Sequence, residues 1–133
     1  MFEKDYLMRL FTDFMNGINR IVNSIDKEDI EGAKTQIQRS YGFLGNDSDY
    51  FINTDVDDLL TFFKTKEGDY LRRVQMLAEL ISLDAELQTD REKRIKLVKK
   101  AIQLQEYFIE NSNEYSLQMA KRVKEMKILL SSD

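Results

Sequence analysis

The chain has 133 residues, a formal net charge of −4, and no cysteine, histidine or proline. Its length suits one domain with a single core, which removes about two-thirds of the unfolded surface from water. The missing residue types exclude thiolate nucleophiles, imidazole bases and nearly every zinc or transition-metal site. We therefore expect no cofactor, no metal and no enzymatic activity.

Residues 5–44 are predicted to form a helical hairpin. Apolar residues recur at spacings of three and four from Leu7 to Ile25, which is typical of a helix that is mostly hidden. Ser24 or Asp26 can cap the second helix, which ends at Gly42 to Gly45. One apolar face is predicted for this second helix, and it consists of Ile30, Ala33, Ile37 and Tyr41.

Residues 45–66 are predicted to contain a polar break and then one short helix, with Thr54 as its N-cap. Five aspartates in this stretch are also compatible with a calcium site, because hard cations bind clustered carboxylates. The spacing lacks the third oxygen ligand, the turn glycine and the glutamate of a calcium loop, so capping and solvation are the preferred interpretation. The five are Asp47, Asp49, Asp55, Asp57 and Asp58.

Residues 69–111 are predicted to form a central hairpin, with Thr89 as the N-cap of its second helix. The first helix, residues 70–87, carries apolar residues on two sides, which predicts that other helices cover it from both flanks. Its polar residues form a narrow wedge, namely Gln75, Glu79, Ser82 and Glu86.

A last helix is predicted over residues 114–131. Residues 1–90 contain 10 Lys/Arg and 18 Asp/Glu, whereas residues 91–133 contain 10 and 6, so an acidic part precedes a basic one. Ion pairs within one domain are the simplest interpretation of this asymmetry. We predict an all-α, single-domain bundle of five to six antiparallel helices.

Four phenylalanines are candidates for a partner-binding surface, either in a homodimer or in a groove for a partner helix. The alternative is ordinary burial in the core of the domain. They are Phe11, Phe14, Phe62 and Phe63.

Four lysines are candidates for anion binding, together with basic residues of the last helix. No aromatic residues are interleaved with these lysines, and the chain as a whole is acidic. A solvated face is therefore the preferred interpretation, and nucleic acid is disfavoured as a partner. The acidic pairs Asp84 with Glu86 and Glu106 with Glu110 are interpreted as surface residues rather than catalytic carboxylates. The lysines are Lys93, Lys96, Lys99 and Lys100.

The spacing of Val74, Leu77, Ala78 and Ile81, with Ala101 in the following helix, resembles tetratricopeptide helical hairpins. Asp29 to Ala33, followed by Ile37 and Ser40, resembles the second helix of another such repeat. The resemblance implies hairpins that stack side by side.

Four segments in order along the chain are similar to those of a family of short, all-helical bacterial proteins of unknown function with such hairpins. Membership implies a cytoplasmic bacterial protein and no particular activity. The segments are residues 5–10, 57–60, 77–80 and 100–104.

The start of the chain lacks a basic leader, and no run of about 18 apolar residues occurs. We therefore expect a cytoplasmic protein that is not exported, does not span a membrane and has no membrane among its partners. The predicted function is that of a non-enzymatic protein–protein interaction module. The alternative is a small regulator that binds nucleic acid or an acidic partner through the C-terminal basic helices.

Overall fold

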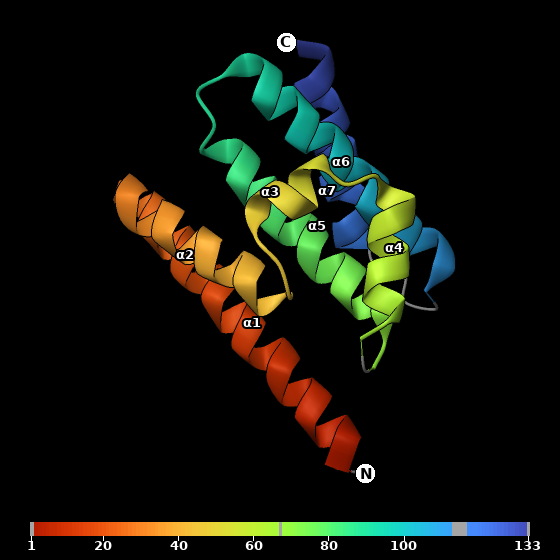
Figure 1. Cartoon of the computed structure of the whole chain (residues 1–133). Helices are drawn as coiled ribbons and strands as arrows, with labels where there is room; N and C mark the ends of the chain where they lie inside the picture. Colours follow the sequence, from red (N-terminus) through yellow and green to blue (C-terminus); the bar gives the residue numbers. More distant parts are fainter. Residues whose placement is uncertain (1, 67, 113–116, 133) are drawn as a thin grey trace.

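The computed structural model describes residues 2–66, 68–112 and 117–132, and over these ranges the chain is all-helical, with no strand (Figure 1). Five or six helices were expected, and the described residues form seven. Across these ranges, none of the helices combines the length and apolar character needed to cross a membrane. The helices are α1 (Phe2–Asp26), α2 (Ile30–Phe43), α3 (Ser48–Asn53), α4 (Val56–Lys64), α5 (Tyr70–Glu86), α6 (Arg91–Asn111) and α7 (Leu117–Ser132).

Helices α1 and α2 form the predicted N-terminal hairpin. The N-cap of α2 is Asp29, whose carboxylate accepts a 3.0 Å hydrogen bond from the amide of Gly32, so the expected caps Ser24 and Asp26 are wrong. These two residues belong to α1, which continues to Asp26. The ring centroids of Phe14 and Phe43 lie 6.0 Å apart, which places the end of α2 against the middle of α1.

The predicted polar break contains the short helix α3. Asp47 caps this helix by accepting a 2.8 Å hydrogen bond from the amide of Tyr50, as the capping interpretation predicts. Two apolar side chains, Phe51 and Ile52, are buried and fix α3 on the core. Thr54 is the C-cap of α3, so its prediction as the N-cap of the next helix is wrong; Asp55 occupies that position.

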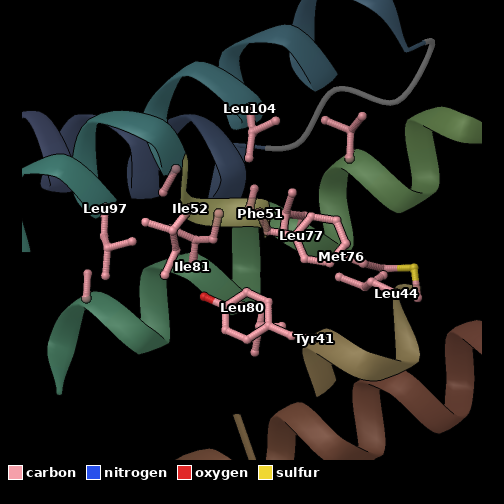
Figure 2. Close-up of a cluster of buried hydrophobic side chains, with 14 of the residues drawn as sticks. Tyr41, Leu44, Phe51, Ile52, Met76, Leu77, Leu80, Ile81, Leu97 and Leu104 are labelled. Carbon is pink, nitrogen blue, oxygen red and sulfur yellow. The ribbon is translucent and has the colours of Figure 1, made fainter. Parts of the chain in front are cut away.

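Helix α5 lies at the centre of the molecule, as predicted. Leu77, Leu80 and Ile81 are fully buried, and Leu83 and Leu87 are partly buried against the same core. Figure 2 shows side chains of α2, α3 and α6 converging on α5. This core includes residues of all seven helices, so α5 is covered from both flanks.

Helices α6 and α7 complete the packing around α5. The N-cap of α6 is Asp90, which accepts a hydrogen bond from the amide of Glu92. The prediction of Thr89 as this N-cap is therefore wrong by one residue. The described part of the last helix begins at Leu117, and its predicted start at Glu114 lies outside the described residues. Helix α7 runs in the same direction as α5, because Arg122 contacts Glu79 and Met126 contacts Ser82.

Candidate functional site

A hollow of about 620 Å³ lies between α1, α5 and α7, and α6 closes one end of it. We call it the groove. Its floor is the polar wedge of α5, namely Gln75, Glu79, Ser82 and Glu86. These residues follow one another at spacings of four, three and four, so they form a straight stripe about 16 Å long on one face of the helix.

The wall that α1 forms is mainly apolar, and the wall that α7 forms is mixed. Helix α1 contributes Met15, Ile18 and Val22, and α7 contributes Met126 and Leu129 beside two charged residues, Arg122 and Glu125. Val22 is 37% exposed and Leu129 is 57% exposed, so each wall has a large apolar side chain open to solvent. A polar floor between walls with exposed apolar side chains can receive an amphipathic segment, whose polar residues face the floor.

Three of the four floor residues are held by contacts within the same chain. Gln75 accepts a 2.6 Å hydrogen bond from Arg72, and Glu79 forms an ion pair with Arg122 of α7. The hydroxyl of Ser82 donates a 2.9 Å hydrogen bond to the carbonyl of Ala78, its own helix. These contacts fix the positions of the polar groups before any partner arrives.

Glu86, at the α6 end of the stripe, is in a different environment. Its pKa is raised above the ordinary value of 4.5, mainly because partial burial penalises the charged form. Arg122 opposes this effect and Asp26 adds to it. Among the described residues, the structure shows no hydrogen bond or ion pair that would hold the carboxylate of Glu86.

The four predicted partner-binding phenylalanines do not form one surface. Phe14 and Phe63 are buried, so ordinary burial accounts for both. Phe11 is partly buried beneath the guanidinium of Arg72, 5.0 Å from its ring centroid. Phe62 packs in an aromatic cluster with Tyr50, Phe51 and Phe63.

The four predicted anion-binding lysines divide into two pairs. Lys93, Lys96 and Lys99 are exposed, and Lys96 also donates a 2.8 Å hydrogen bond to Asn53 Oδ1. Lys100 donates to three backbone carbonyls at the end of α3, those of Phe51 (3.0 Å), Ile52 (2.5 Å) and Thr54 (2.6 Å). Burial lowers the pKa of Lys100, with a further contribution from Lys96.

Helix ends leave backbone carbonyls without intrahelical partners, and cations stabilise this negative end. Lys100 therefore serves as the C-terminal cap of α3, and Lys96 binds the side chain of Asn53 beside it. The sequence interpretation of all four lysines as one solvated face is wrong for Lys100, which is partly buried against the end of a short helix from a distant part of the chain. Lys96 is exposed, as that interpretation predicts, although it also contacts Asn53.

A second hollow, about 540 Å³ in volume, lies between α4 and α6 and is lined mainly by polar groups. It contains Asp55, Asp57, Glu106 and Glu110, with Lys100 at one side. Within the described ranges, no group of three or more His, Cys, Asp or Glu residues is arranged to hold a metal ion.

Sequence reasoning also missed a buried polar cluster. Asp84, interpreted as a surface residue paired with Glu86, is only 6% exposed. Its carboxylate accepts hydrogen bonds from the Tyr41 hydroxyl (2.7 Å) and from Gln88 Nε2 (2.8 Å). Position within α5 could have indicated this burial, because Asp84 lies on the apolar side with Leu77, Leu80 and Ile81.

Comparison of the chain with protein-family models, curated proteins and solved structures finds no match in any of the three. The two resemblances described from the sequence therefore remain predictions.

Proposed function

We propose that this protein is a non-catalytic binding module that holds an amphipathic helix of a partner protein in the groove. The observation that supports this proposal is the polar stripe of α5 between two walls that expose the apolar side chains Val22 and Leu129. An amphipathic helix can bury its apolar face on these walls and bring polar residues to the stripe. The proposal includes no reaction, no cofactor and no metal.

The proposed architecture is a single domain over residues 1–133 with tetratricopeptide-like hairpins. Helices α1 and α2 form one hairpin, and α5 and α6 form the next. Helix α7 then occupies the position of the first helix of a third repeat. The common direction of α5 and α7 supports this arrangement. We also propose that the protein is bacterial and cytoplasmic, as the resemblance implies.

A matched pair of variants tests the groove. Leu129 lines the groove, whereas its neighbour Ile128 does not, and the two side chains are 57% and 58% exposed. Leu129→Asp and Ile128→Asp therefore introduce the same charge at equal exposure, one inside the groove and one outside. Neither substitution removes a buried core residue.

The experiment is a quantitative pull-down from an extract of the native cell with the parent chain and the two variants. We expect a partner that the parent and Ile128→Asp retain equally and that Leu129→Asp loses by at least tenfold. Proteins retained equally by all three chains would contradict binding in the groove.

A second copy of the chain is the rival occupant, since a homodimer is one of the predicted partners. Size-exclusion chromatography with light scattering distinguishes the two occupants. A mass that doubles with concentration for the parent and for Ile128→Asp, but not for Leu129→Asp, would identify a second copy as the occupant.

The alternative function, binding of nucleic acid or an acidic partner through the basic helices, has less support. Lys96 and Lys100 already bind the end of α3. Lys93 and Lys99, which are exposed, are the appropriate positions for its test. Affinity for a nucleic acid that falls steeply with salt and disappears in Lys93→Glu with Lys99→Glu would favour it.

A further inference from the structure

Among the described residues, the groove carries an excess of negative charge. Besides Glu86, its charged lining residues are Glu79 of α5, Arg94 of α6, and Arg122 and Glu125 of α7, and Asp26 of α1 also acts on Glu86 electrostatically. In this described set, which includes Glu86, four carboxylates outnumber two guanidinium groups. Arg122 is already paired with Glu79, so its charge is shared between two carboxylates.

We infer that the helix bound in the groove is basic as well as apolar, and that it places a Lys or Arg side chain against Glu86. This inference rests on the proposed function and adds the chemistry of the partner. Glu79 is a weaker candidate for the same role because Arg122 already neutralises it. Glu79 and Glu86 lie seven residues apart, about 10 Å along α5. A single cationic side chain of the partner can therefore contact one of these carboxylates without contacting the other.

The electrostatic argument is the cost of the ionised form of Glu86 in the unoccupied groove. Partial burial removes water from the carboxylate of Glu86, and the positive charge of Arg122 makes up for this lost hydration only in part. The pKa of Glu86 is therefore raised. A cation on the partner would compensate for the lost hydration and favour the ionised form. A partner with an acidic residue at this point would meet like charges, which disfavours its binding.

Proton linkage follows from the same contact. Binding of a cationic partner shifts Glu86 toward its ionised form, so the complex releases a proton in the pH range where free Glu86 is still partly protonated. Affinity should therefore fall as pH decreases through the raised pKa of Glu86. Glu86→Gln should remove this dependence on pH.

The test uses the full chain and a displayed library of 16-residue amphipathic helices. Leucine or isoleucine occupies the apolar face of each peptide, and the remaining positions are varied among Lys, Gln and Glu. Peptides that bind the parent and lose affinity for Leu129→Asp occupy the groove. Their Kd values are then measured by fluorescence anisotropy for the parent, Glu86→Gln and Glu92→Gln.

We expect these peptides to share a lysine at one position. Replacing that lysine by glutamine should weaken binding to the parent at least fivefold and leave binding to Glu86→Gln unchanged. Glu92→Gln is the matched control, because Glu92 is an exposed residue of α6 that does not line the groove. The lysine preference should persist in this variant.

Two outcomes would overturn the inference in distinguishable ways. Groove peptides without a lysine preference, or a preference that persists in Glu86→Gln, would contradict the basic partner and leave the binding function intact. If no peptide binds in a way that depends on Leu129, both the inference and the proposed function fail.

Discussion

The hydroxyl of Tyr41 donates a 2.7 Å hydrogen bond to Oδ2 of Asp84, which lies 43 positions further along the chain. Both residues are buried, and Gln88 donates to the second oxygen of the same carboxylate. The contact joins α2 to the C-terminal part of α5. It therefore fixes the N-terminal hairpin, and with it the α1 wall, relative to the floor of the groove.

Tyr41→Phe should lower the free energy of unfolding by about 1–3 kcal/mol, because it removes a donor from a buried carboxylate without changing the ring packing. Urea denaturation measures this loss. A double-mutant cycle with Asp84→Asn separates the hydrogen bond from other effects, and a coupling energy above about 0.5 kcal/mol is expected. Strictly additive losses would contradict a direct contact.

Lys100→Met should destabilise the protein by about 1.5–3 kcal/mol, because the ammonium group satisfies three carbonyls at the end of α3. Methionine keeps the apolar part of the side chain, so the loss reports the charged head. Lys99→Met is the control: Lys99 is the exposed neighbour, and its change should stay within about 0.5 kcal/mol. Equal unfolding midpoints for the two variants would exclude the proposed cap.

Leu77→Asp should unfold the chain, because Leu77 is fully buried at the centre of the core and an unpaired carboxylate there costs several kcal/mol. Circular dichroism melting provides the measurement. Ile128→Asp, which places the same charge on an exposed position of α7, should melt within a few degrees of the parent. Cooperative melting of Leu77→Asp at the temperature of the parent would contradict the central position of α5.

The helical class and the central position of α5 could be predicted because they depend on periodicity within single segments. Leu77, Leu80 and Ile81 repeat at helical spacing, and two apolar sides on one helix require two coverings. Caps were less predictable. Thr54 and Thr89 each precede an aspartate that can cap equally well, and the difference of one residue is set by the backbone at the helix end.

The groove could be predicted only in part. The polar wedge of α5 was visible in the sequence, but its position between α1 and α7 depends on how distant helices pack. The same limit applies to Lys100, whose partners lie 46 to 49 positions earlier in the chain. The sequence pattern around a charged residue on a helix surface is the same whether water or another helix covers its side chain.

The pH dependence of stability supplies a test of Glu86 that needs no partner. Its pKa in the folded protein is raised above the value of 4.5 expected when it is exposed, mainly by partial burial. The folded state therefore holds this proton to higher pH than the unfolded state does. The resulting contribution to stability is fully present below about pH 4.5 and is lost as pH rises through the folded pKa.

Glu86→Gln cannot ionise, so it should lack this loss. We expect the unfolding free energy of Glu86→Gln minus that of the parent to increase with pH across this window and then to become constant. Urea denaturation at closely spaced pH values measures the difference, with Glu92→Gln as the control for removal of an exposed charge from the same chain. A difference that does not change with pH, or that changes equally in the control, would mean that burial in the groove does not perturb Glu86, and the electrostatic basis for a basic partner would be lost.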